Sequence, residues 1–536
     1  MLGVAVPVSQ PEILLVTLNA RYHHCSFGLR YLFANLRELQ SRARIDEFTI
    51  SQSSREIAEK ILASRPRIVG FGVYIWNTSQ TEEVVSIIKR VSPETLVVLG
   101  GPEVSFETET QRLFSIADYT ICGEAEVLFY EFCSGYLAGK PLPTEKKISG
   151  ELPDLKLIAS PYSFYSDEDI RHRVIYVEAS RGCPYKCEYC LSSLDKSVRG
   201  FDLDLFLAEM QGLIDRGVRQ FKFVDRTFNL SVATSTRILR FFLERMEFGL
   251  FVHFELVPDR LPIEIRNLIT QFPRGSLQFE IGIQTWSPEV SRLVSRRQDY
   301  SRIVENFKFL REHTGVHTHA DLIVGLPGET LPSFAKGFDA VSALEPDEVQ
   351  VGLLKRLKGT PISRHDEPFQ MVYQEHPPFQ ILKTSTMDFA TIQRMTRFSK
   401  FWDLIANSGN FVSSIRILRD LACRRPDSSL FECFMELSEM LSMRHAQTHG
   451  IALQSLVESV WVFLTQNLAL DEGLVREALI EDYTGRVKRD LPAFLRSKGA
   501  GSREQHRQAA LPAGQMGGAP QRQRKHQAGA RSEVVQ

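Results

Sequence analysis

Short apolar runs alternate with amphipathic helical patterns over the first 150 residues, and this alternation constrains the fold more than any other feature. The apolar runs, each of strand length, lie at 13–16, 68–73, 96–100 and 119–122. The helical patterns between them lie at 29–39, 57–62 and 82–91. Strands that alternate with helices form parallel sheets covered on both faces. We therefore expect a doubly wound, flavodoxin-like (Rossmann-type) α/β domain over residues 10–150.

Ligands of such domains bind beyond the carboxyl ends of the strands. The loops expected there are 19–28, 74–79, 100–105 and 123–126. One of them begins with Gly100-Gly101, a pair that allows a backbone to approach a large flat ligand closely. Taken alone, the pair indicates only a tight turn.

Three cysteines, Cys183, Cys187 and Cys190, follow the apolar run 174–177 and lie within eight residues of one another. Gly182 and Pro184 favour a loop at this point. Thiolates are the preferred ligands of iron–sulfur clusters, and three of them on a four-iron cluster leave one iron open to a small molecule. A zinc site, which usually has a fourth Cys or His at similar spacing, and redox thiols remain the alternatives.

Strand-like runs continue after the cysteines, at 220–224, 251–256, 277–283, 319–324 and 348–354. Together with 174–179 they make six βα units. Their spacing predicts an open (β/α)6 barrel over residues 165–365, in which chemistry collects at the carboxyl ends of the strands. The cysteine loop lies at such an end.

Beyond the barrel the pattern becomes helical. One amphipathic face comprises Ile392, Met395, Phe398, Trp402 and Ile405, and a second runs through 453–464. We expect an α-helical C-terminal domain over residues 366–497 that packs against the barrel mouth. The segment 498–536 is rich in Gln, Ala, Gly and Arg without periodicity, which predicts disorder.

The totals limit the partners and the compartment. The net charge is −1 over 536 residues, so there is no overall attraction to nucleic acid or to an anionic membrane. No apolar run is long enough to span a bilayer, and the N-terminal stretch lacks a basic leader. Eight cysteines in so long a chain are no disulfide scaffold. We expect a cytoplasmic protein with no membrane partner and, most simply, no nucleic-acid partner.

The Cys-x3-Cys-x2-Cys signature, with the aromatic Tyr189 before its last cysteine, resembles that of the radical S-adenosylmethionine (SAM) superfamily. Residues 10–150 resemble the cobalamin (B12)-binding domain that precedes many of its members. In that domain paired glycines follow the fourth strand and Gly-Glu-x-Glu follows the fifth, here 100–101 and 123–126. The resemblance implies that cobalamin is bound and contacts Gly100, Gly101 and Glu124.

The first loop departs from the cobalamin-binding pattern. The motif Asp-x-His-x-x-Gly, which supplies a histidine ligand to the corrin, is absent from residues 19–28. His23 and His24 are present, but the Asp that would orient a ligating imidazole is not. Either the corrin is held without a histidine ligand, or the fold is retained without the ligand.

Later strands are similar to those of oxygen-independent coproporphyrinogen oxidases and methylthiotransferases. The matching runs are 253–259, 282–285 followed by 292–296, and 321–330, whereas the usual glycine-rich motif after the second strand is replaced by 224–229. The resemblance implies that the cysteines bind a 4Fe-4S cluster and that SAM lies beside it. The implied SAM contacts are Glu255 and Asp321 at the ribose, Gln284 and Arg296 at the methionine end, and Tyr189.

The resemblance implies reductive cleavage of SAM to methionine and a 5′-deoxyadenosyl radical. Methyl transfer to an organic small molecule, rearrangement and oxidation all remain open, and no catalytic residue is identified. An electron donor such as flavodoxin or ferredoxin is implied as a partner.

Two other functions are weighed against this one. A methylthiotransferase-like RNA modifier would need a second three-cysteine set, but the other cysteines are scattered: Cys25, Cys122, Cys133, Cys423 and Cys433. It would also need a basic C-terminal β-barrel, for which the sequence gives no clear sign. A non-catalytic cluster or corrin sensor would not need the SAM contacts.

Overall fold

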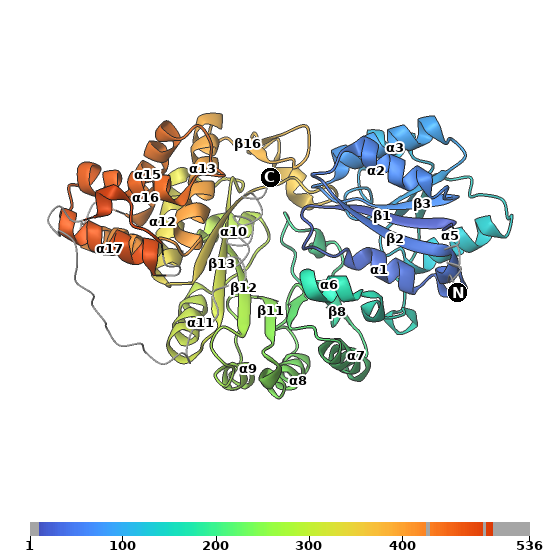
Figure 1. Cartoon of the computed structure of the whole chain (residues 1–536), viewed down its shortest axis with the longest axis horizontal. Coiled ribbons are helices and arrows are strands. Elements are labelled where there is room, and N and C mark those ends of the chain that lie inside the picture. Colours follow the sequence, from blue (N-terminus) through green and yellow to red (C-terminus); the bar gives the residue numbers. More distant parts are fainter. Residues whose placement is uncertain (1–9, 425–428, 486–488, 497–536) are drawn as a thin grey trace, which may run out of the picture. The chain divides into compact units, whose positions relative to one another are not determined.

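The computed structural model describes residues 10–424, 429–485 and 489–496 (Figure 1). The chain divides into two compact units. The first comprises residues 1–255, 355–364 and 373–380, and the second comprises 256–354, 365–372 and 381–536. The finer division at 10–150, 165–365 and 366–497 stays a prediction, and the expected disordered segment 498–536 lies outside the described residues.

The first unit begins with a parallel six-stranded sheet in the order β2-β1-β3-β4-β5-β6. Its strands are β1 (Ile13–Asn19), β2 (Ala43–Thr49), β3 (Ile68–Gly72), β4 (Leu96–Gly100), β5 (Tyr119–Cys122) and β6 (Lys147–Ser149). Its helices are α1 (Phe27–Ala34), α2 (Ser54–Ala63), α3 (Thr78–Val91), α4 (Arg112–Ile116) and α5 (Glu126–Leu137). The prediction of a doubly wound α/β domain is confirmed.

Alternate residues of β1 face two separate cores. Leu14 and Val16 pack with residues of α2, α3 and α4, whereas Ile13 and Leu15 pack with residues of α1 and α5. Helices therefore cover both faces of the sheet, as Figure 1 shows for α1 on one side and α2 and α3 on the other. This arrangement leaves the carboxyl ends of the strands free to form a site.

A second parallel sheet of six strands has the order β14-β13-β12-β11-β10-β7. In the first unit lie β7 (Ile175–Val177), β10 (Gln220–Phe223) and most of β11 (Phe251–Leu256); in the second lie β12 (Leu277–Gln284), β13 (His317–Val324) and β14 (Glu348–Leu353). The helices between them are α7 (Leu203–Asp215), α8 (Val232–Leu243), α9 (Ile263–Ile269), α10 (Pro288–Leu293), α11 (Tyr300–His313) and α12 (Leu331–Ala343). The open (β/α)6 arrangement is confirmed.

Shorter elements complete the two units. Helix α6 (Asp167–His172) precedes β7, and the strands β8 (Ser180–Arg181) and β9 (Arg199–Gly200) pair in antiparallel fashion around the cysteine loop. The strands β15 (Val372–Tyr373) and β16 (Ile381–Lys383) precede the helical region.

The C-terminal region of the second unit is helical, as predicted. Its helices are α13 (Phe389–Trp402), α14 (Val412–Arg424), α15 (Leu430–Arg444), α16 (Leu453–Val462) and α17 (Glu472–Thr484). The five residues of the first predicted apolar face are all buried. Phe338 of α12 packs edge-on against Phe398 and Trp402 of α13, with ring centroids 5.1 and 4.8 Å away. Helix α13 is thereby anchored to the outer helical layer of the barrel.

Asn407, just beyond α13, completes the edge of β14. Its side-chain oxygen accepts a hydrogen bond from Val349 N at 3.1 Å, and its side-chain nitrogen donates to Val349 O at 2.9 Å. An edge strand has unpaired backbone groups, and this amide satisfies two of them. The helical region thus covers α12 and β14.

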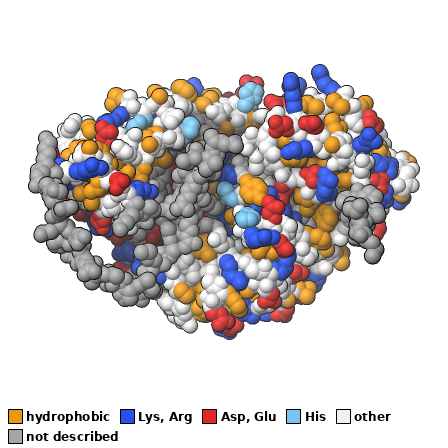
Figure 2. Space-filling view, viewed as in Figure 1, with side chains coloured by type: hydrophobic (Ala, Val, Ile, Leu, Met, Phe, Trp, Pro, Cys, Tyr) orange, Lys and Arg blue, Asp and Glu red, His pale blue; other side chains and the backbone are white. Residues whose placement is uncertain are grey.

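Within the described ranges, no helix combines the length and the apolar character that a bilayer crossing requires. Acidic and basic side chains are interspersed over the described part of the face that Figure 2 shows.

Candidate cofactor sites

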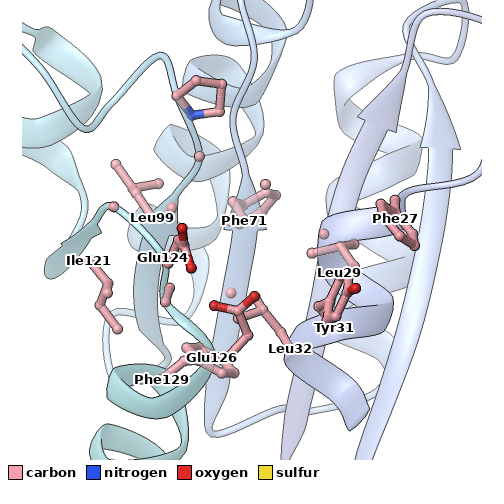
Figure 3. Close-up of a pocket in the computed structure, with 18 of the residues that line it drawn as sticks. Phe27, Leu29, Tyr31, Leu32, Phe71, Leu99, Ile121, Glu124, Glu126 and Phe129 are labelled. Carbon is pink, nitrogen blue, oxygen red and sulfur yellow. The ribbon is translucent and has the colours of Figure 1, made fainter. Parts of the chain in front are cut away.

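A cavity of about 500 Å³ lies at the carboxyl end of the N-terminal sheet (Figure 3). Its walls come from the ends of β3, β4 and β5, from α1 and from the start of α5. Most wall residues are apolar, among them Leu29, Leu32, Phe71, Leu99, Ile121 and Phe129. The three residues predicted to contact cobalamin, Gly100, Gly101 and Glu124, all line this cavity. Their role stays a prediction, but the structure brings them together.

Gly101 is required by the packing of the backbone. It has a φ of +107°, and a Cβ atom there would lie 2.5 Å from the carbonyl oxygen of Val73. Val73 N also donates a hydrogen bond to Gly100 O at 2.8 Å. The glycine pair therefore lets the segments after β3 and β4 meet closely, which holds the floor of the cavity whether or not a ligand is present.

Arg181 places a mostly buried positive charge at the cavity wall, with a side chain that is 12% exposed. Its guanidinium forms ion pairs with Glu124 at 2.8 Å, Glu126 at 2.8 Å and Glu178 at 2.9 Å. Burial alone would lower the pKa of Arg181, but Glu178 and Glu126 outweigh it and raise that pKa. Arg181 is two residues before Cys183, so these pairs join the loop after β5 to the base of the cysteine loop.

His23 and His24 lie away from the cavity wall. His24 Nδ1 is 2.6 Å from the Tyr176 hydroxyl, and the two imidazole rings contact each other with centroids 4.1 Å apart. The described residues that line the cavity include no histidine. A corrin in this cavity would therefore be held without a histidine ligand from its wall, the first of the two alternatives that the sequence left open.

The cysteine loop is compact before any cofactor is added. Cys183 N donates a hydrogen bond to Asp195 O at 3.0 Å, and Cys190 N donates to Cys187 O at 3.1 Å. A Cβ atom at Gly182 would lie 1.9 Å from the carbonyl oxygen of Ser197, so only glycine fits there. The β8–β9 pairing closes the loop at its base.

The electrostatics of the three thiols fit a metal centre. Burial raises the pKa of Cys183, and the neighbouring Cys190 and Cys187 raise it further. The Cys183 thiol therefore resists ionisation unless a metal stabilises its thiolate. None of the described cysteines forms a disulfide. No three His, Cys, Asp or Glu side chains in the described ranges converge on one ion position, whereas the thiolates of a four-iron cluster each bind a different iron.

Glu188, between Cys187 and Tyr189, is held from the segment 355–364. Ile362 N donates a hydrogen bond to Glu188 O at 3.0 Å, and Arg364 forms an ion pair with the Glu188 carboxylate, which is 2% exposed. The cysteine loop is thus braced by a part of the chain that follows it by more than 160 residues in sequence.

Glu255, predicted to contact the SAM ribose, lies on β11 beside the cysteine loop. Arg226 Nη1 is 3.3 Å from each of its carboxylate oxygens. Arg226 also lines the cavity, and its charge opposes the rise in the pKa of Cys183. The segment 224–229, which departs from the family's glycine-rich motif, thus supplies the cation of Arg226. This cation lines the cavity, acts on the pKa of Cys183 and contacts Glu255.

The preceding residue, Asp225, fixes the strand end from which the cysteine loop departs. It accepts hydrogen bonds from Ala179 N at 3.0 Å and from Ser180 Oγ at 2.6 Å. Burial raises the pKa of Asp225 to about 7.

The remaining predicted SAM contacts lie together in the second unit. Gln284 ends β12 with a φ of +72°, and Arg296 donates a hydrogen bond to the carbonyl of Gly282. Asp321 pairs in register with Gly282 from the neighbouring strand β13, and its carboxylate is 3.5 Å from His319 Nε2. The structure therefore groups Gln284, Arg296 and Asp321 in one unit, and the cysteines with Glu255 in the other.

Sequence reasoning missed the charged residues Glu126, Glu178, Arg181 and Arg226 of the cavity wall. The repeated acid in Gly-Glu-x-Glu was the one available signal. The arginines gave little, because apart from Glu178, three residues before Arg181, their partners are far away in sequence.

Three family models match the chain. Residues 13–132 match the B12 binding domain, residues 177–339 match the radical SAM superfamily, and residues 367–516 match a protein family of unknown function, DUF4080.

Among curated relatives, an uncharacterized methyltransferase of Pyrococcus horikoshii is 24% identical over 62% of this chain and 76% of its own length. The cobalamin-dependent radical SAM methyltransferase TokK of Streptomyces tokunonensis is 24% identical over 58% of this chain and 49% of its own. A tRNA-2-methylthio-N(6)-dimethylallyladenosine synthase of Acinetobacter baumannii is 21% identical over 52% of this chain and 59% of its own length. The chain thus spans only about half to three-fifths of the length of the latter two relatives.

The fold is similar to that of the radical SAM methyltransferase TsrM from Kitasatospora setae. The TM-score is 0.55 at 16% identity, over 80% of this chain and 95% of TsrM. The models of the B12 binding domain and of the radical SAM superfamily match this chain in that order. The chain therefore carries a B12-binding domain at residues 13–132 ahead of a radical SAM domain at residues 177–339.

Proposed function

We propose that the protein is a cobalamin-dependent radical SAM methyltransferase that acts on a small organic molecule. One observation carries the proposal: within the first unit, two residues that line the cavity also lie close to the cysteine loop. Arg181 and Arg226 both line the cavity. Arg181 is two residues before Cys183 in the sequence, and the charge of Arg226 acts to lower the pKa of the Cys183 thiol. Such proximity suits the passage of a methyl group between two cofactors.

When bound, the cluster supplies the electron that cleaves SAM, and the corrin carries the methyl group. The residues of the chain bind and orient these groups. Cys183, Cys187 and Cys190 would hold the cluster, and the cationic Arg296 would neutralise the SAM carboxylate. Glu255 would accept hydrogen bonds from the ribose hydroxyls. The apolar walls of the cavity would exclude water from the corrin face.

The relatives support methyl transfer over the other reactions. TokK and TsrM are both methyltransferases, and TsrM has been solved with cobalamin and a 4Fe-4S cluster and with its tryptophan substrate. The methylthiotransferases match as well, but the sequence here has no second three-cysteine set. A small-molecule substrate, a flavodoxin- or ferredoxin-type electron donor and a cytoplasmic location complete the proposal.

The experiment separates two fates of SAM. Methyl transfer leaves S-adenosylhomocysteine, whereas reductive cleavage leaves methionine and 5′-deoxyadenosine. The protein is reconstituted anaerobically with iron and sulfide, then incubated with SAM and a strong reductant, with and without hydroxocobalamin. We expect 5′-deoxyadenosine from the reconstituted protein, and S-adenosylhomocysteine only when cobalamin is present. Release of 5′-deoxyadenosine with no cobalamin-dependent S-adenosylhomocysteine would overturn methyl transfer.

A further inference from the structure

Glu126, a residue of the cavity wall, has one carboxylate oxygen without a hydrogen-bond partner. The residue begins α5, is 6% exposed and lines the cavity, where Figure 3 shows its carboxylate facing Leu29, Tyr31 and Leu32 of α1. Its Oε1 forms the ion pair with Arg181 at 2.8 Å. Its Oε2 is fully buried and has no partner in the structure.

A buried carboxylate oxygen without a partner costs free energy, because it has lost its hydrogen bonds to water and has formed none within the protein. The side chains nearest to it in the cavity wall are mostly apolar, including Phe129 one turn further along α5. A hydrogen-bond donor supplied by the contents of the cavity would satisfy this oxygen. The unmet acceptor therefore marks a position for a donor group of a ligand.

Glu124, the other acid of Gly-Glu-x-Glu, differs from Glu126 in this respect. Arg181 Nη1 contacts its Oε2 at 2.8 Å, and Arg199 contacts its Oε1. Both oxygens of Glu124 are thus held by arginines. Of the two acids, Glu126 is the one with an oxygen left for a ligand.

We infer that Glu126 Oε2 accepts a hydrogen bond from a peripheral carboxamide of the corrin. This inference rests on the proposed function, since it takes cobalamin as the occupant of the cavity. A corrin carries primary amides around its rim, each with two N–H donors, and these match a buried carboxylate. A corrin with a carboxylate at the same position would instead meet a like charge. Glu126 therefore selects the amidated corrin over its acid.

The test measures equilibrium binding by the change in corrin absorbance, independently of turnover. Wild-type protein is titrated with cyanocobalamin and with each cyanocobalamin derivative in which one propionamide or acetamide is hydrolysed to a carboxylate. We expect one derivative to bind about ten-fold or more weakly than cyanocobalamin, because a charged hydrogen bond is replaced by repulsion. The side chain of Glu126→Gln can donate a hydrogen bond to a carboxylate. In this variant the same derivative should therefore recover most of the lost binding affinity.

A matched control lies on the same helix: Glu131 is exposed, and Glu131→Gln should bind every corrin as the wild type does. Equal affinity of wild-type protein for cyanocobalamin and all derivatives would overturn the inference and leave the proposed function intact. Failure of wild-type protein to bind cyanocobalamin would overturn both.

Discussion

Lys358 Nζ lies 2.7 Å from Glu103 Oε1, and the two side chains are only 13% and 3% exposed. This ion pair ties the segment 355–364 to the loop that follows Gly101 at the floor of the cavity. The same segment holds the cysteine loop through the hydrogen bond from Ile362 N to Glu188 O. One stretch of chain, late in the sequence, therefore fixes the loops of both proposed cofactor sites in the first unit.

Replacing Lys358 by Met should destabilise the first unit by about 3–5 kcal/mol, because it leaves the Glu103 carboxylate buried without its cation. Burial already raises the pKa of Glu103, and Lys358 opposes that rise. Without Lys358 the pKa should rise further, so the acid keeps its proton to higher pH. The destabilisation should therefore be greatest at neutral pH and shrink as the pH falls toward 5. Denaturant unfolding of wild type and variant across this range measures it.

Lys355, three residues earlier and exposed, provides the control. Lys355→Met should change the free energy of unfolding by less than about 0.5 kcal/mol. The double variant with Glu103→Gln and Lys358→Met removes both charges and should recover most of the lost stability. A double variant no more stable than Lys358→Met would show that the ion pair is not the cause.

Glu329, in the second unit, predicts a separate pH dependence. Its carboxyl group is buried, and this burial raises its pKa from 4.5 to about 7, while Thr285 donates a hydrogen bond to it at 2.7 Å. Between these two pH values the native state keeps a proton that the unfolded state releases. Wild-type stability should therefore fall with rising pH in this window by up to about 1.4 kcal/mol per pH unit.

Glu329→Gln, which cannot ionise, isolates this contribution. The difference in unfolding free energy between the variant and the wild type should grow in favour of the variant from about pH 4.5 to 7 and then level off. A difference that stays constant over that range would contradict the raised pKa.

Cys187→Ala should abolish the iron–sulfur cluster. After anaerobic reconstitution the wild type should hold about four irons per chain, and the variant close to none. Cys133→Ala is the matched control, since Cys133 is buried in the core between α5 and the N-terminal sheet, away from the cysteine loop. Iron and sulfide analysis of the three proteins gives the answer, and full iron content in the Cys187 variant would refute the cluster assignment.

Glu255→Ala should weaken SAM binding about ten-fold, because a carboxylate that accepts hydrogen bonds from the ribose is worth on the order of 1.5–3 kcal/mol. Equilibrium dialysis with the cluster-loaded protein measures the affinity directly. The iron content should stay at the wild-type value, which separates loss of a SAM contact from loss of the cluster. Unchanged affinity would contradict the role of Glu255 at the ribose.

The parallel strands could be predicted from the sequence because they are buried on both faces. The run 96–100 is continuously apolar, and it is β4, Leu96–Gly100. Strand β2, Ala43–Thr49, escaped prediction because it lies at the sheet edge, where only Phe48 is buried and charged residues alternate with apolar ones. Burial, rather than strand formation itself, produced the readable pattern.

The polar wall of the cavity could not be predicted in the same way. Glu124 and Arg181 are 57 residues apart in sequence, so no local spacing connects them. A charged residue in a sequence indicates exposure by default, and only the fold shows that Arg181 is mostly covered and surrounded by three carboxylates. The glycine pair and the cysteine spacing were readable because their chemistry is contained within a few consecutive residues.

Substitutions at two glycines of the cavity wall distinguish the effect of backbone strain from the effect of close packing. Gly101 and Gly123 both have positive φ, +107° and +82°, so Ala is strained at either position. A Cβ atom at Gly101 would meet Val73 O at 2.5 Å, whereas one at Gly123 has no atom within 4 Å. Gly123→Ala should therefore cost about 1–2 kcal/mol of unfolding free energy, and Gly101→Ala about 3 kcal/mol or more, since overpacking adds to the strain.

The loss of affinity for cobalamin should follow the same order, with a larger loss in Gly101→Ala than in Gly123→Ala. In Gly101→Ala the segments after β3 and β4 have to move apart, which deforms the floor of the cavity, so the affinity for hydroxocobalamin should fall by at least ten-fold. In Gly123→Ala the wall keeps its shape and the added methyl group meets only open space, so a small change is expected. Thermal unfolding and absorbance titration of the two variants test this. Equal losses in both would mean that backbone conformation alone, and not the close approach of Gly101 to Val73, shapes the site.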